Sequence, residues 1–271
     1  MDYMEAKVIA IGSSDEKVKN IIKGKFDDSN VIVVDDLFTL SLEECKTSAL
    51  QYMLICEDLI TSEEAKEIAN YYKSKVDCYS ISQKTFEKIS AKQTCAGMVL
   101  VTKINQATPP AKEKGNLTIL VCDALEISGN IGTIFRTAEA TKVDYIIFCN
   151  QKAKIIDNKV LHASRGMIFC VPFKIVETTQ DAINLLNQLN AHPIICEPEQ
   201  GTDFKAFEYK GNTALIVGSE RYGVDKKWFE HPNAQFLKIP MFGKMDSLNV
   251  AVATSLILYE AKYFKLNKLK S

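Results

Sequence analysis

Residues 117–271 alternate between short runs rich in Val, Ile and Leu and longer segments with helical spacing, and this alternation restricts the possible folds more than any other feature. Apolar strands separated by amphipathic helices are typical of a parallel sheet covered on both faces. We therefore predict an α/β fold with a parallel sheet. The expected strands lie at 117–125, 144–150, 169–176, 192–199, 213–220 and 236–241, and the expected helices at 129–141, 158–166, 180–189 and 247–266.

The first 105 residues predict a second, smaller α/β unit. Apolar runs such as KVIAIG and VIVV alternate with polar segments, and Thr61 or Ser62 is the expected N-cap of a helix with an acidic first turn. The segment 106–116, QATPPAKEKGN, combines charges and glycine with adjacent prolines that hold a chain extended. We therefore predict two domains, 1–105 and 117–271, joined by a linker at 106–116.

Composition excludes several classes of protein. Hydrophobic residues make up 46% and charged residues 25% of the chain, and the formal net charge is -1, as in ordinary soluble globular proteins and unlike disordered or fibrous ones. No apolar run approaches the ~20 residues of a membrane helix, and the acidic start lacks the basic segment of an export signal. Eight cysteines without a CxxC pair and three scattered histidines predict a reduced cytoplasmic protein with no metal site.

Ligands of parallel α/β sheets bind beyond the carboxyl ends of the strands, so the polar loops there are candidate sites. In the first such loop, Gly129 and Gly132 bracket a turn into a helix whose exposed N–H groups suit an anion, with Asn130 as the expected cap and Arg136 beyond it. The glycine spacing is not G-x-G-x-x-G, so the dinucleotide fingerprint is absent. A capped helix with a surface arginine accounts for the same residues.

The loop at 214–225 ends a buried strand with Gly218, where a ligand can approach the backbone closely. Glu220 and Arg221 follow it directly. A carboxylate and a guanidinium side by side can also form a simple surface pair, so this loop on its own leaves both interpretations open.

The loop at 237–256 leads into the last expected helix. Pro240 ends the preceding strand, Gly243 permits a tight turn, and Ser247 is the expected N-cap. Asn249 then lies in the first helical turn among apolar residues, where its amide needs a polar partner.

Three motifs in these loops resemble those of the SpoU/TrmH class of the SPOUT superfamily. They read N-x-G-x-x-x-R-T-A at 130–138, G-S-E-x-x-G at 218–223 and I-P-M-x-G-x-x-x-S-L-N-V-A-x-A at 239–253, with ASRG at 163–166 between them. Each motif is weak alone, but their order and gaps make a specific signal over residues 116–265. Residues 1–105 resemble the L30e-like RNA-binding domain that precedes this catalytic domain in rRNA 2'-O-methyltransferases, including the thiostrepton-resistance type.

The resemblance implies that the C-terminal segment threads a loop and forms a trefoil knot, a rare exception among protein folds. It also implies S-adenosylmethionine as the cofactor, held in a bent shape by the backbones of the second and third motifs. The implied cofactor-binding residues are Gly218, Ser219, Glu220, Ile239, Met241, Ser247, Leu248 and Asn249.

The implied reaction transfers a methyl group to a ribose 2'-hydroxyl of RNA, with ribosomal RNA as the expected substrate. Arg136, one of only three arginines in the chain, is the implied catalytic residue. A guanidinium is a poor base at neutral pH, so we expect it to orient the 2'-oxygen and neutralise the adjacent phosphate, while a role as base stays open. The residues implied to hold Arg136 and the ribose in place are Asn130, Glu220, Ser247 and Asn249.

The resemblance further implies a homodimer through the knotted domain, with Val250, Ala251, Ala253 and Thr254 in its interface, although the same face fits the core of a monomer. The N-terminal domains would then grip structured RNA by shape and phosphate contact. Residues 1–108 carry 13 Lys against 17 acidic residues, which departs from a basic RNA binder. A local basic face is still expected from Lys17, Lys19, Lys23 and Lys25.

Three alternatives were weighed against this interpretation. A silent homologue that binds RNA without chemistry would have no need of both Arg136 and Asn249. A nucleotide-dependent enzyme on an ordinary doubly wound sheet would need a glycine-rich fingerprint or a P-loop, and both are missing. The third alternative is a related 2'-O-methyltransferase that acts on tRNA. The small N-terminal domain favours rRNA over tRNA, but only by analogy.

Overall fold

The computed structural model describes residues 8–90, 96–111, 115–197, 199–219 and 221–268. The chain forms two compact units, one made of Met1–Asn105 with Ile156–Leu161 and the other of Gln106–Ile155 with His162–Ser271. The division thus falls after Asn105, where the expected linker starts. The short segment Ile156–Leu161 groups with the first unit, although the sequence places it inside the second domain.

The first unit contains a five-stranded mixed sheet in the order β1-β4-β3-β5-β2. Strands β1, β4 and β3 run parallel, whereas β5 pairs antiparallel with both β3 and β2. The expected small α/β unit is therefore present. The bounds are β1 Ile9–Ala10, β2 Val31–Val34, β3 Ala49–Ile55, β4 Asp77–Ser80 and β5 Met98–Lys103.

Four helices of the first unit begin at side-chain caps, and the sequence predicts one of these caps. Ser62 accepts a hydrogen bond from Ala65 N, so it is the N-cap expected for α4. Asp15, Asp36 and Ser82 cap α1, α2 and α5 in the same way. The bounds are α1 Glu16–Lys23, α2 Leu37–Ser41, α3 Glu43–Lys46, η1 Glu57–Leu59, α4 Glu63–Lys73 and α5 Gln83–Ile89.

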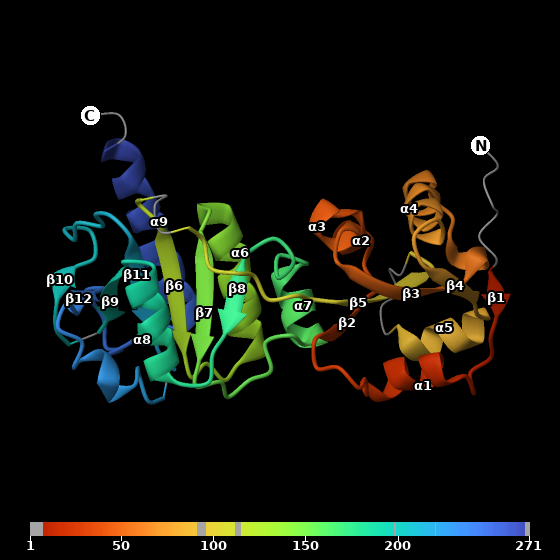
Figure 1. Ribbon diagram of the computed structural model, residues 1–271, viewed down its shortest axis with the longest axis horizontal. Coiled ribbons are helices and arrows are strands. Elements are labelled where there is room, and N and C mark those ends of the chain that lie inside the picture. Colours follow the sequence, from red (N-terminus) through yellow and green to blue (C-terminus); the bar gives the residue numbers. More distant parts are fainter. Residues whose placement is uncertain (1–7, 91–95, 112–114, 198, 220, 269–271) are drawn as a thin grey trace. The chain divides into compact units, whose positions relative to one another are not determined.

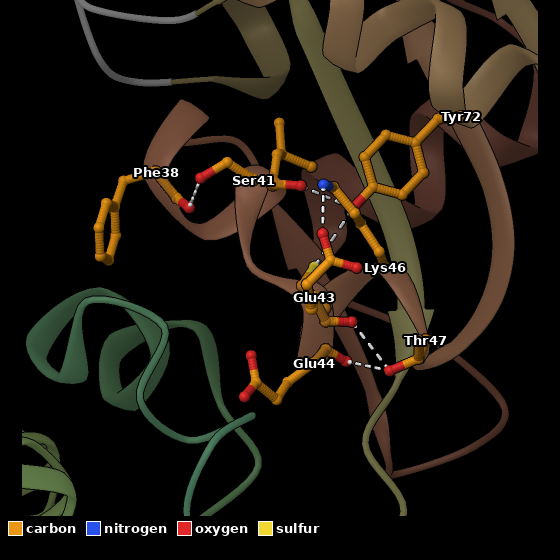
Figure 2. A network of polar contacts seen from close by, with 9 residues as sticks. Phe38, Ser41, Glu43, Glu44, Lys46, Thr47 and Tyr72 are labelled. Atoms are coloured by element: carbon orange, nitrogen blue, oxygen red, sulfur yellow. Dashed lines mark hydrogen bonds and ion pairs between the residues drawn. The ribbon is translucent and has the colours of Figure 1, made fainter.

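The corner between α2 and α3 is held by a network of polar contacts (Figure 2). Ser41 Oγ donates to the carbonyl of Phe38 at 2.7 Å, and Thr47 Oγ1 donates to the carbonyl of Glu43 at 2.8 Å. The buried hydroxyl of Tyr72, on α4, donates to the carbonyl of Leu40 at 2.9 Å. These bonds connect side chains to carbonyls of the two short helices and attach the corner to α4.

The second unit contains a seven-stranded sheet in the order β10-β12-β9-β11-β6-β7-β8, and every pairing in it is parallel (Figure 1). This confirms the predicted α/β fold with a parallel sheet. All residues of the central strands β6, β7 and β11 are buried. The bounds are β6 Thr118–Asp123, β7 Tyr145–Cys149, β8 Phe173–Ile175, β9 His192–Cys196, β10 Thr202–Asp203, β11 Thr213–Val217 and β12 Gln235–Lys238.

Helices cover both faces of this sheet. Side chains of α8 join alternate residues of β6, β7 and β11 in one apolar cluster, which also contains the buried Trp228 of η3. Helices α6 and α9 pack against each other, and Thr137 Oγ1 and Ser255 Oγ lie 2.9 Å apart between them. The bounds are α6 Ser128–Thr141, α7 Asn158–Ser164, α8 Thr179–Gln188, η3 Lys226–Trp228 and α9 Val250–Lys268.

The expected strands and helices of the second unit are present, with ends shifted by up to three residues in all but one case. The strand expected at 169–176 is reduced to Phe173–Ile175, because turns extend up to residue 171 and Pro172 follows them. The last helix begins at Val250 and not at Ser247. The short edge strand β10 was not expected from the sequence.

The start of the expected linker is bound to the edge of the sheet at β8. Ala107 N donates to the carbonyl of Phe173 at 3.0 Å, and Ile175 N donates to the side-chain oxygen of Gln106 at 2.7 Å. The hydroxyl of Tyr145 donates to the carbonyl of Ala107 at 2.7 Å. Gln106 and Ala107 therefore protect an edge that would otherwise expose unpaired backbone groups.

A lysine fastens the C-terminal helix to the end of the sheet opposite the strand carboxyl ends. Lys265 on α9 is 7% exposed, and its ammonium donates to the carbonyls of Asn116, Leu117 and Gly211 at 3.2, 2.7 and 3.1 Å. The hydroxyl of Thr213 lies 3.0 Å from the same nitrogen. Burial lowers the pKa of Lys265 to about 8.

The cysteines behave as small hydrophobic residues, as predicted. Seven lie in the described parts of the chain, all are free, and five of them are buried. Within the same parts, no helix is both long and apolar enough to cross a membrane.

Candidate functional site

A cavity of about 330 Å³ opens at the carboxyl end of the second unit's sheet, among the segments that follow β9, β11 and β12. Its volume lies in the ~300–1,000 Å³ range of small-molecule sites, and its position is the one expected for ligands of parallel sheets. The lining residues are Cys196, Glu197, Val217, Gly218, Ser219, Tyr222, Gly223, Val224, Ile239, Met241, Asp246, Ser247, Leu248, Val250 and Ala253.

Most of the predicted cofactor-binding residues line this cavity. Six of the eight do so, and Asn249 lies directly beside it in sequence without being part of the lining. Glu220 lies outside the described residues. The six are Gly218, Ser219, Ile239, Met241, Ser247 and Leu248.

The second motif forms a tight loop after β11. Ser219 N donates to the carbonyl of Gly223 at 3.0 Å and Gly223 N donates to that of Ser219 at 2.9 Å, while the Ser219 hydroxyl accepts from Tyr222 N at 3.1 Å. A Cβ on Gly218 would lie 2.1 Å from the carbonyl oxygen of Gly223, so only glycine fits there. The loop thus keeps its backbone close to the cavity.

The third motif leads from β12 to α9, and its cap differs from the prediction. Asn249, not Ser247, is the N-cap, because Asn249 Oδ1 accepts from Ala251 N at 3.0 Å and from Val252 N at 3.4 Å. The Ser247 hydroxyl donates instead to Asp246 at 3.2 Å. The cap prediction for Ser247 was therefore wrong, and Asn249 precedes the first turn of α9.

The first motif opens α6, and Asn130 does not cap it. Helix α6 begins at Ser128 after Ile127, which provides no side-chain cap, so Asn130 already lies within the first turn. Its Oδ1 instead accepts a hydrogen bond from Asn249 Nδ2 at 3.1 Å. The polar partner that the sequence required for Asn249 is thus supplied by the first motif.

Gly132 permits the close packing of α6 on the ASRG segment. A Cβ at this position would lie 2.3 Å from the Cβ of Ala163. Arg136 lies one turn further along α6, is exposed, and is absent from the lining of the cavity as described. The structure therefore brings Asn130 and Asn249 together but leaves Arg136 outside the cavity of its own chain.

A buried carboxylate, which sequence reasoning missed, anchors the end of the second-motif loop. Asp123 is fully buried at the end of β6, and it accepts from Asn150 Nδ2 at 2.7 Å, from Asp225 N at 2.7 Å and from Trp228 Nε1 at 3.0 Å. Thr179 Oγ1 closes the network by accepting from Asn150 Nδ2 and donating to Asp225, both at 2.7 Å. The network fixes the chain two residues after Gly223.

Glu197 and Asp246 were also missed, and they are the two charged side chains in the described lining. Glu197 directly follows β9, so the rule that polar residues at strand ends form sites would have identified it. Its neighbour Cys196 is a poor nucleophile here, because burial raises its pKa to about 12. The charged part of the described lining is therefore acidic.

The chain is similar to known RNA methyltransferases over its second half. The family model described as SpoU rRNA Methylase matches residues 117–259. A Staphylococcus aureus (strain COL) protein assigned to the TrmH family of tRNA/rRNA methyltransferases is 36% identical over 150 residues, which cover 55% of this chain and 60% of that protein. The chain thus spans about three fifths of this relative's length.

Two further proteins are similar over most of the chain. The 23S rRNA (guanosine(2553)-2'-O)-methyltransferase RlmP of Bacillus subtilis is 25% identical over 228 residues, covering 83% of this chain and 88% of that protein. The crystal structure of the SpoU methyltransferase AviRb from Streptomyces viridochromogenes, in complex with AdoMet, superposes with a TM-score of 0.83 at 19% identity and covers 93% of this chain and 98% of that one. At this identity the structural likeness establishes the fold.

Proposed function

The chain belongs to the SpoU rRNA methylase family, and from this premise we infer that it transfers a methyl group from S-adenosylmethionine to a ribose 2'-hydroxyl of RNA. We propose ribosomal RNA as the substrate, since RlmP is similar over 83% of the chain and acts on 23S rRNA. The observation that carries the proposal is the cavity itself, because described residues of the second and third motifs both line it.

The residues present fit S-adenosylmethionine. Val217, Ile239 and Leu248 give the cavity apolar walls suited to a flat adenine ring, and the loop at Gly218 leaves backbone groups within reach of its edge. Glu197 and Asp246 supply negative charge for a cationic ligand. We propose that these residues and the other lining residues of the two motifs hold the cofactor.

S-adenosylmethionine, when bound, supplies an electrophilic methyl group on a positively charged sulfur. The chain's part is to place a ribose hydroxyl in line with that methyl group and to stabilise the negative charge left on the oxygen when its proton passes to solvent. That charge is neutralised as the oxygen forms its bond to the methyl group. We assign this part to Arg136, whose guanidinium stays charged at neutral pH and binds phosphate with two parallel hydrogen bonds. Asn130 and Asn249, bonded at 3.1 Å, would hold the adjoining loop in place.

Because Arg136 lies outside the cavity of its own chain, we propose that it serves the cavity of a second copy in a homodimer. Of the residues expected in the dimer interface, Val250, Ala251 and Thr254 are buried within the chain, and Ala253, which is partly buried, lines the cavity. Helix α9 instead exposes an apolar stripe at helical spacing beside α6, which supports association through these helices. The stripe consists of Val252, Leu256, Tyr259, Tyr263 and Leu266.

Mixing two inactive variants tests the homodimer. An Arg136→Ala subunit keeps an intact cavity, and a Gly218→Ala subunit keeps an intact arginine. If Arg136 acts on the partner's cavity, mixed dimers contain one complete site, and activity returns when the two variants are unfolded and refolded together. Activity that stays at the level of the separate variants would exclude a shared site.

We also propose the trefoil knot and an RNA-binding role for the first unit. The knot is supported by the path of the chain, which runs from β12 near one edge through the third motif to α9, whose Lys265 binds carbonyls at the start of the central strands. The first unit presents lysines on and beside α1, and the ammonium of Lys17 lies 4.6 Å from the ring centre of Tyr79. We place the protein in the cytoplasm, where its RNA substrate occurs.

The experiment that tests the function uses total RNA from cells lacking the gene. The RNA is incubated with the protein and methyl-labelled S-adenosylmethionine, fractionated, and hydrolysed with alkali, which leaves the bond next to a 2'-O-methylribose intact. We expect label in an alkali-resistant dinucleotide from ribosomal RNA. Label in tRNA would change the substrate, and no label in any fraction would favour a silent RNA-binding homologue.

A further inference from the structure

The two most exposed aromatic rings among the described residues both lie on loops of the cavity. Phe242 is 97% exposed and follows the lining residue Met241, and Tyr222 is 68% exposed and lines the cavity itself. The next most exposed aromatic side chains are Tyr263 on α9 at 60%, Phe38 at 48% and Tyr259 at 45%, so Phe242 stands well apart from the rest. A phenylalanine so fully exposed to water is unusual and suggests that a partner covers it.

Phe242 lies on the third-motif loop, between β12 and α9. The next residue, Gly243, has no neighbouring heavy atom within 4 Å of where its Cβ would lie, so this part of the loop is open to solvent. Lys244 is exposed beside it, and on the second-motif loop the guanidinium of Arg221 lies 5.1 Å from the ring centre of Tyr222. Aromatic faces next to cationic groups are the features with which proteins bind unpaired nucleotides.

We propose that Phe242 is the platform on which the base of the methylated nucleotide stacks; this rests on the proposed function. A ribose hydroxyl can reach a methyl donor inside the cavity only if its nucleotide leaves the helical stack. The base then loses its stacking neighbours. The Phe242 ring, next to the cavity lining, replaces one of them, and Lys244 and Arg221 neutralise the flanking phosphates.

The platform accepts any of the four bases, because every base has a flat π face. It therefore contributes to affinity and to positioning of the ribose, while the choice of nucleotide comes from other contacts. A second copy of the chain is the competing occupant. The exposed stripe on α9 already offers a surface for that copy, so we assign Phe242 to RNA.

The test compares Phe242→Ala, Phe242→Leu and Phe242→Trp, with Met245→Ala as the matched control. Met245 is 68% exposed in the same loop but has no aromatic face. Phe242→Ala is expected to lower kcat/KM for RNA by roughly 5- to 150-fold, the range of one lost base–aromatic stack. Phe242→Trp should keep kcat/KM near the wild-type value, whereas Phe242→Leu should lower it as Phe242→Ala does. Met245→Ala should resemble the wild type. Affinity for S-adenosylmethionine and molecular mass should be unchanged in all four variants.

Binding of a short unstructured RNA, measured without methylation, separates this proposal from the proposed function. If the wild type methylates no RNA but Phe242→Ala still weakens RNA binding, the platform stands and the catalytic function falls. If Phe242→Ala binds and methylates RNA like the wild type, the platform is rejected. A Phe242→Leu variant as active as the wild type, or a Phe242→Ala variant whose dimer dissociates, would also reject it.

Discussion

Asn249 Nδ2 donates a hydrogen bond to Asn130 Oδ1 at 3.1 Å, and this bond joins the third motif to the first turn of α6. The same Asn249 side chain caps α9 through its oxygen, so its two amide atoms have separate tasks. The cap fixes the orientation of the amide and thereby aims the nitrogen at Asn130. One residue thus begins a helix and connects two segments that lie 119 residues apart.

Asn249→Asp separates these two tasks. The aspartate still caps α9, but it places an oxygen against Asn130 Oδ1 where a donor stood. We expect the unfolding free energy to change by less than about 1 kcal/mol, while methyl transfer falls roughly 10-fold because the loop loses its attachment. Asn249→Ala loses both tasks and should also lose about 1 kcal/mol of stability. Urea unfolding measures the stability, and methyl-transfer assays measure the activity. If Asn249→Asp lost as much stability as Asn249→Ala, the two tasks would not be separable.

Gly218→Ala should weaken cofactor binding without unfolding the protein. The new Cβ would lie 2.1 Å from the Gly223 carbonyl oxygen, so the second-motif loop has to move. Overpacking of this size typically costs 1–3 kcal/mol, which corresponds to a loss of affinity for S-adenosylmethionine of roughly 5- to 150-fold in calorimetric titration. The matched control is Gly129→Ala, because Gly129 has no neighbouring atom within 4 Å of its Cβ position. Equal affinities of the two variants would show that the loop does not form the cofactor site.

Asp123→Asn should weaken the cofactor site from a distance. The carboxylate accepts hydrogen bonds from several donors, including Trp228 Nε1 and Asp225 N. The NH₂ group of an asparagine cannot accept from such donors. We expect affinity for S-adenosylmethionine to fall about 10-fold and the fluorescence of Trp228, the only tryptophan in the chain, to shift to longer wavelength. Asp144→Asn, at the start of β7, should leave both unchanged. A normal Trp228 spectrum in Asp123→Asn would mean that the network does not depend on the carboxylate.

Lys265 predicts a dependence of stability on pH. Its pKa is about 8 in the folded chain, below the ~10.4 of an unfolded lysine, so between these values the unfolded state binds more protons. Stability contributed by this group therefore rises as pH increases from about 8 to 10.4 and is constant below that window. The rise should be on the order of 3 kcal/mol and absent in Lys265→Met. Urea unfolding of both proteins across this range isolates it, and parallel pH curves would refute it.

Most of the fold could be predicted from the sequence, because runs such as LTILVCDAL and DYIIFCN are apolar enough to fix the buried strands without tertiary information. The residue that caps α9 could not be predicted from the sequence. Ser247 and Asn249 are both good N-caps, and the choice between them coincides with the contact to Asn130, which is distant in sequence. The edge strand β10 has only two residues and gives no periodic signal.

The candidate site was predictable where residues close in sequence form it. Gly218, Ile239 and Leu248 were named from their motifs, and they line the cavity. Asp123 was missed because it lies inside a strand-like run, and its partners Asn150 and Asp225 come from other strands and loops. Such a network depends on tertiary structure and leaves no pattern in local sequence.

The measurement that tests the central claim most directly is methyl transfer by Arg136→Ala, with affinity for S-adenosylmethionine determined on the same preparation. We expect transfer to ribosomal RNA to fall by about 100-fold or more, because the charged group that stabilises the deprotonated 2'-oxygen is removed. Affinity for S-adenosylmethionine should change less than about 3-fold, since the substitution leaves the described lining residues of the cavity in place. Near-normal turnover by Arg136→Ala would contradict the assigned role of the guanidinium and with it the proposed mechanism.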